Sequence, residues 1–127
     1  MAVNIQMNRY RKASVDASSP ERLLLLLVRE AVRSAEAAAL EQVPDERRRL
    51  LDKSRRIVAE LSDSLNTDYG GPMAFNLLRL YIFINRRLSE ALGGDDAGLP
   101  EALRVLRHVR DTWEEAVEIA AAQAGSP

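Results

Sequence analysis

The sequence has no cysteine, a single histidine, and only one tryptophan, three tyrosines and two phenylalanines in 127 residues. Without cysteine, disulfides and thiol catalysis are excluded, and the chain is compatible with a reducing compartment. The single histidine, His108, falls on the polar face of a predicted helix beside Arg104 and Asp111, where a solvent-exposed, titrating side chain is expected. No Glu-x-x-His pattern of a di-metal bundle occurs. We therefore expect no enzyme activity, no metal site and no cofactor.

Long apolar runs and an excess of charge of one sign are also missing. The longest apolar run, Leu23–Val28, is far shorter than the ~20 residues of a membrane-spanning helix. A net charge of −1 gives no bulk attraction to nucleic acid or anionic membrane, and acidic neighbours offset the basic residues near Arg47–Arg49. The first ten residues lack the apolar core of a signal peptide. These absences predict a protein that is not secreted by the general route and has no nucleic-acid partner and no integral membrane association.

What the chain does have is helix-forming residues in four periodic segments. Alanine, leucine, glutamate and arginine dominate, and apolar residues recur three and four positions apart over about 18–40, 46–66, 72–92 and 99–122. Short polar or glycine-containing connections separate these segments. The pattern predicts an all-α fold, an antiparallel up-down-up-down four-helix bundle in one domain over 1–127. Residues 1–17 are expected to be a flexible or capping N-terminal segment, 18–122 the bundle, and 123–127 a frayed tail.

Each predicted helix has one apolar stripe that is expected to face the core. The stripes are Leu24, Leu27, Val28, Ala31, Ala35 and Ala38; Leu50, Leu51, Ser54, Ile57, Val58, Leu61 and Leu65; Met73, Ala74, Leu77, Tyr81, Ile84 and Leu88; and Leu103, Leu106, Val109, Trp113, Ala116, Val117 and Ala120. Ser18 or Ser19 is expected to cap the first helix, and Gly93-Gly94 to end the third.

The first and third segments carry more apolar residues than one stripe needs. Leu25 and Leu26 fall outside the first stripe, and Phe75, Leu78 and Ile82 form a second face on the third helix. Such a face either packs against a neighbouring helix or remains exposed as a docking surface for an amphipathic partner helix. The pattern alone leaves both alternatives open.

Two further residues are candidates for partner contacts. Tyr10 lies in the weakly periodic N-terminal segment, where it either packs back on the bundle or covers a binding groove as a removable plug. Asn76 lies within the third helix next to Phe75, and its side chain either hydrogen-bonds a partner's backbone or serves as a local cap or inter-helix bond.

Several motifs resemble those of the flagellar export chaperone family FliS. Ser19–Leu24 is similar to the family's helix-opening Ser-Pro-x-x-Leu, and Ile57–Leu65 is similar to its second-helix pattern. Gly70–Tyr81 contains the Gly-Gly, Ala-x-Asn-Leu and Leu-Tyr elements of the most specific family signature, and Leu106–Trp113 resembles the final-helix pattern. The order and spacing of these motifs, rather than any one of them, identify the chain as a member of this family.

The resemblance implies a cytoplasmic bacterial chaperone that binds the disordered C-terminal segment of flagellin. By this analogy it prevents premature polymerisation and delivers flagellin to the flagellar type III export apparatus, with an export-gate component as a further candidate partner. The candidate flagellin contacts are Tyr10, Leu25, Leu26, Phe75, Asn76, Leu78 and Ile82. The alternative is a structural bundle whose extra apolar surface closes a homodimer, so the sequence leaves monomer and homodimer open.

Overall fold

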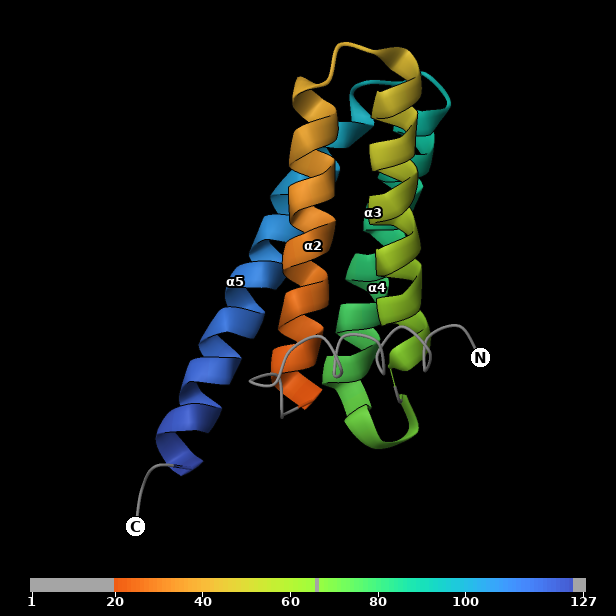
Figure 1. The fold of residues 1–127 in the computed structure, drawn as a ribbon. Coiled ribbons are helices and arrows are strands. Elements are labelled where there is room, and N and C mark those ends of the chain that lie inside the picture. Colours follow the sequence, from red (N-terminus) through yellow and green to blue (C-terminus); the bar gives the residue numbers. More distant parts are fainter. Residues whose placement is uncertain (1–19, 66, 125–127) are drawn as a thin grey trace.

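A computed structural model describes residues 20–65 and 67–124, which form four α-helices joined by short connections (Figure 1). The helices are α2 (Pro20–Leu40), α3 (Pro44–Ser64), α4 (Thr67–Leu92) and α5 (Gly98–Ala124). The described part of the chain contains no strand. The predicted all-α fold is therefore confirmed.

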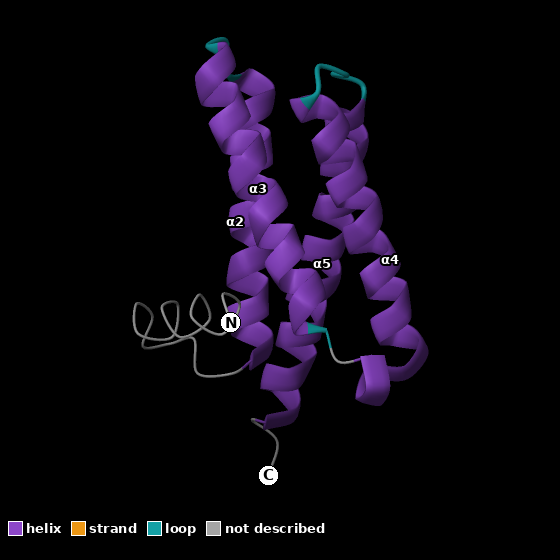
Figure 2. Ribbon diagram, turned by 90° about the vertical axis from the view of Figure 1, so that its right-hand side faces the viewer, coloured by secondary structure: helices purple, strands orange, loops and turns teal. Residues whose placement is uncertain are grey.

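The helices form a closed bundle in which each packs against two neighbours. α2 contacts α3 and α5, and α4 contacts the same two helices from the opposite side; within the described residues, α2 and α4 do not contact each other. Figures 1 and 2 show successive helices running in opposite directions. This is the predicted up-down-up-down arrangement, which follows from the short connections.

Helix boundaries follow the proline and glycine residues. α3 begins at Pro44, two residues before the predicted start, because proline at the first helical position loses no hydrogen bond. The turn expected at Gly70-Gly71 is present as a kink within α4: Gly71 has φ 58° and ψ −147°, outside the helical region, directly before Pro72. α4 ends as predicted with a left-handed glycine, Gly94 at φ 105°, where the Asp95 N–H donates to the Glu90 carbonyl at 2.9 Å.

The buried core agrees with most of the predicted stripes. Residues with less than 2% exposure come from all four helices: Leu23, Val28, Leu51, Leu61, Tyr81, Ile84, Leu88, Leu106 and Val109 are among them. Leu24, Leu50, Leu65, Leu77 and Trp113 are partly buried and pack against this cluster. The core therefore runs along the whole bundle, as four facing stripes require.

Two predicted core positions are wrong, and both lie at the same end of the bundle. Met73 is 79% exposed, and Ala120 is also exposed. Figure 1 shows the C-terminal half of α5 leaning away from α2. Because α5 diverges there, side chains that point toward its last turns have no helix to pack against. They are exposed even though their helical spacing predicts burial.

The remaining predictions concern the N-terminal segment and the C-terminal end of α5. The N-terminal segment 1–17, including Tyr10, and the caps Ser18 and Ser19 lie outside the described residues. At the other end α5 continues to Ala124, so its helix extends two residues past the predicted end at 122.

Candidate partner-binding site

The second apolar face predicted on α4 is exposed. Phe75 is 55% and Ile82 49% exposed, and Leu78 lies between them half-buried. Because these residues are three, four and seven positions apart, they share one side of the helix. Figure 2 shows α4 at an edge of the bundle, where one side of the helix has no described helix beside it, and the exposure of Phe75 and Ile82 assigns them to such a side. We call Phe75, Leu78 and Ile82 the α4 outer face.

Leu25 does not belong to an exposed surface, which corrects the prediction that it lies outside the core. It is only 5% exposed. Leu25 lies seven residues before Val32, and so on the same side of α2, where Val32 is 2% exposed. α2 packs against both α3 and α5, so its buried arc is wider than the single stripe assumed from the sequence.

The remaining candidates are not gathered on the α4 outer face. Leu26 is half-buried on α2, which does not contact α4 in the described part of the chain. Asn76 is exposed but lies about 100° round α4 from Phe75, since a helix turns by that angle at each residue. The structure therefore brings together three of the seven predicted residues, and Tyr10 is outside the described residues.

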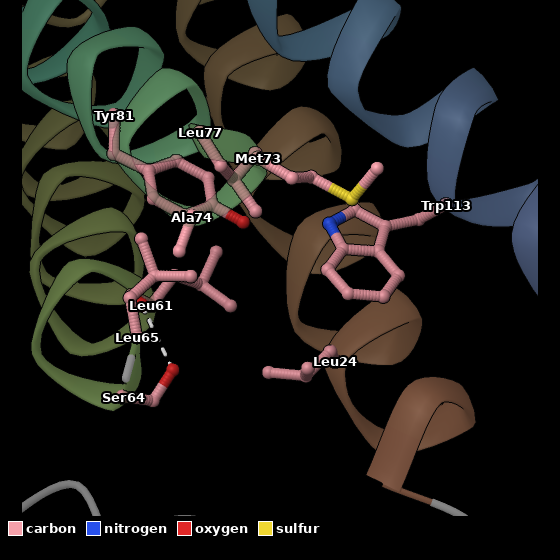
Figure 3. Close-up of a pocket in the computed structure, with 9 residues that line it drawn as sticks. All are labelled: Leu24, Leu61, Ser64, Leu65, Met73, Ala74, Leu77, Tyr81 and Trp113. Atoms are coloured by element: carbon pink, nitrogen blue, oxygen red, sulfur yellow. Dashed lines mark hydrogen bonds between the residues drawn. The ribbon is translucent and has the colours of Figure 1, made fainter. Parts of the chain in front are cut away.

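An apolar pocket opens at the end of the bundle where α5 diverges. It has a volume of about 240 Å³, and all four helices contribute to it (Figure 3). Its lining is Leu24 from α2, Leu61 and Ser64 from α3, Leu65 from the connection that follows α3, Met73, Ala74, Leu77 and Tyr81 from α4, and Trp113 from α5. The Ser64 hydroxyl donates to the Leu61 carbonyl at 2.8 Å, so this polar group is already satisfied. The pocket is suited to an apolar side chain.

Tyr81 and Trp113 meet at this pocket. Burial raises the pKa of the Tyr81 phenol to about 12, and a hydrogen bond with Trp113 partly opposes that rise. In Figure 3 the Tyr81 hydroxyl points toward the Trp113 indole. Both residues were predicted to face the core, and Figure 3 shows them on facing sides of this pocket.

Sequence reasoning missed this pocket. Met73 was assigned to the core because it fits the stripe of α4, and nothing in its spacing distinguishes it from a buried residue. The divergence of α5 is a tertiary feature. The one signal in the sequence is the weakening of the α5 stripe after Trp113, where alanines replace leucines at Ala116 and Ala120.

The described residues offer no arrangement for metal or membrane chemistry. They hold no group of three or more histidine, cysteine, aspartate or glutamate side chains placed to bind a metal ion. No helix among them is both long enough and apolar enough to cross a membrane. His108 is exposed, as its place on the polar face of α5 predicted.

Comparison with known proteins gives consistent matches over most of the chain. A family model described as "Flagellar protein FliS" matches residues 2–120. A Pseudomonas aeruginosa protein named "Flagellar secretion chaperone FliSB" is 33% identical over 117 residues, which cover 85% of this chain and 92% of the relative. A Vibrio cholerae protein named "Flagellar secretion chaperone FliS" is 28% identical over 118 residues, or 86% of each chain.

Proposed function

The chain belongs to the FliS family of flagellar secretion chaperones, and we propose that it binds the disordered C-terminal segment of flagellin in the bacterial cytoplasm. In this proposal, binding covers the apolar surface through which flagellin subunits polymerise. The complex then passes to the flagellar type III export apparatus, with an export-gate component as the receiving partner.

The observation that carries the proposal is the α4 outer face. Phe75 and Ile82 are each about half exposed, although they belong to a helix whose opposite side buries Tyr81, Ile84 and Leu88. An apolar face of this kind suits the apolar stripe of a partner helix. The nearby pocket, with Met73 at its edge, offers a second place for an apolar side chain of the same segment.

Such binding requires no catalytic chemistry. A disordered segment loses conformational entropy when it folds on a surface, which costs on the order of 2–5 kcal/mol or more. Burial of apolar area offsets this cost at about 25 cal/mol per Å². A rigid bundle with a preformed apolar face can therefore hold its client without ATP, metal or cofactor.

The test is calorimetric titration of a flagellin C-terminal segment into the wild-type protein and two aspartate variants. Ile82→Asp places a charge in the proposed contact, where an unpaired buried carboxylate is unfavourable. Leu40→Asp is the control, because Leu40 is 82% exposed and is the last residue of α2, a different helix from the one that carries the proposed contact. We expect Ile82→Asp to bind at least 10-fold more weakly and Leu40→Asp to bind like wild type.

Wild-type affinity in an Ile82→Asp protein with normal helical circular dichroism would place the client elsewhere. The homodimer alternative uses the same face, so light scattering is measured on the same samples. A wild-type protein that is dimeric, that becomes monomeric through Ile82→Asp, and that does not bind the flagellin segment would replace the chaperone proposal with the dimer.

A further inference from the structure

Two arginines lie along one edge of the α4 outer face. Arg79 and Arg86 are both exposed. They follow Phe75 and Ile82 by four residues each, so each arginine is the next side chain along the helix surface from an exposed apolar one. The two arginines are seven residues apart, which separates them by about 10 Å along the axis. The apolar face therefore has a positively charged edge.

Neither arginine has an acidic partner among the side chains that the structure describes, those of residues 20–65 and 71–124. This differs from their neighbour Arg87, which lies 2.8 Å from Glu90 and 2.9 Å from Glu101. On α3, Arg55 and Arg56 both pair with Asp52. The charges on this edge of α4 are thus left without the local compensation that neighbouring arginines have.

The opposite edge of the same face offers no charged side chain with which a docked helix could pair. Ala74, Tyr81 and Leu88 lie one position before Phe75, Ile82 and Ser89, and all three are buried in the bundle. A helix that docks on the α4 outer face therefore meets the bundle on one side and arginines on the other. Complementarity requires acidic residues on only one edge of its apolar stripe.

We propose that the α4 outer face receives an amphipathic helix that carries aspartate or glutamate side chains, about seven residues apart, along one edge of its apolar stripe, to pair with Arg79 and Arg86. This proposal rests on the proposed function, because the docked helix is taken to belong to the client. It adds the charge pattern by which the α4 outer face recognises that helix. The apolar contact supplies most of the affinity. The arginines fix the register and orientation of the helix and disfavour segments with basic edges.

The first test reverses each charge and measures binding of a flagellin C-terminal segment. Arg79→Glu and Arg86→Glu are compared with Arg104→Glu on α5, because Arg104 is also exposed and has no acidic partner among the described residues. We expect each α4 variant to bind roughly 3- to 10-fold more weakly at low salt, as for a lost and reversed rim contact. The effect should shrink at 0.5 M salt, where the Debye length falls to a few Å. Arg104→Glu should bind like wild type.

A second test does not depend on flagellin. Two designed amphipathic peptides share one leucine stripe, and one carries glutamate along an edge of the stripe where the other carries lysine. We expect the glutamate peptide to bind the wild-type protein more tightly, and Arg79→Glu/Arg86→Glu to prefer the lysine peptide. Equal binding of both peptides, or binding of neither, would overturn the charge pattern.

The two tests separate this inference from the proposed function. If flagellin binds and the α4 reversals match Arg104→Glu, the chaperone proposal stands and the charge pattern is wrong. If flagellin does not bind but the designed peptides show the expected preference, the charge pattern stands and the client is a different acidic helix.

Discussion

Helices α2 and α4 lie on opposite corners of the same bundle, and both contain more apolar residues than one stripe requires. On α2 the additional leucines are largely covered: Leu25 is 5% exposed and Leu26 is half-buried. On α4 they are not: Phe75 is 55% and Ile82 49% exposed. Two helices with similar apolar content thus differ in what their extra residues contact.

The charged residues differ in the same way. The side of α2 that faces α5 is bridged by Arg29–Glu114 at 3.2 Å and Arg107–Glu36 at 2.8 Å, and Lys53 of α3 reaches Glu30 at 2.8 Å. On the outer side of α4, Arg79 and Arg86 have no acidic partner in the described part of the chain. The side of α2 that faces α5 thus has paired charges, whereas the outer face of α4 has exposed apolar residues and unpaired arginines. An open apolar face that also has uncompensated charge is what a binding surface requires.

The contrast between the buried leucines and the exposed residues of the α4 outer face is wrong if truncating either kind to alanine lowers the free energy of unfolding by the same amount. Leu25→Ala and Leu88→Ala remove buried side chains and leave cavities, so each should lower the free energy of unfolding by about 2–5 kcal/mol. Ile82→Ala removes a half-exposed side chain and should cost less than about 1 kcal/mol. Urea denaturation followed by circular dichroism measures all three. If Ile82→Ala is as destabilising as Leu88→Ala, the α4 outer face is part of the core.

The pH dependence of the free energy of unfolding tests whether Tyr81 is buried on the inner side of α4. Its pKa is raised to about 12 in the folded protein, from 10.0 for an exposed phenol. Folding therefore favours the neutral form, and this contribution is complete below pH 10. Between pH 10 and about 12 the free energy of unfolding should fall with pH by at most about 1.4 kcal/mol per pH unit.

Tyr81→Phe provides the control, because it removes the titrating group and keeps the ring. Urea melts at pH 9, 10 and 11 should show a smaller alkaline loss in Tyr81→Phe than in the wild type. Equal losses would mean that the Tyr81 phenol is solvated and that the pocket end of α4 is looser than the structure shows.

Much of this architecture follows from the sequence because helical spacing is a local property. The stripes of α2 and α3, the start of α3 near Pro44, and the glycine that ends α4 all depend on residues close together in the chain. The separation of the second apolar face of α4 from its core stripe also follows from spacing, whereas the exposure of Phe75 and Ile82 on that face is known only from the structure.

The errors come from how the helices pack. Leu25 was misplaced because a helix with two neighbours buries a wider arc than one stripe. Met73 was misplaced because α5 diverges beside it. That divergence cannot be predicted from the residues near Met73 in the chain. The same divergence opens the pocket between Tyr81 and Trp113. Arg79 and Arg86 were visible in the sequence, but only the structure shows which other arginines are paired.

The smallest expected effect concerns the ion pairs that join α2 to α5. The side chains of Arg29 and Glu114 are 47% and 37% exposed, so water screens their attraction. A double-mutant cycle with Arg29→Met and Glu114→Gln should give a coupling energy of about 0.2–1 kcal/mol, decreasing with salt. If the coupling is well above that range and insensitive to salt, the α2–α5 ion pairs contribute substantially to stability. The contrast with α4 would then be one of energy as well as of surface, because two ion pairs would join α2 to α5, whereas among the described residues Arg87–Glu101 joins α4 to α5.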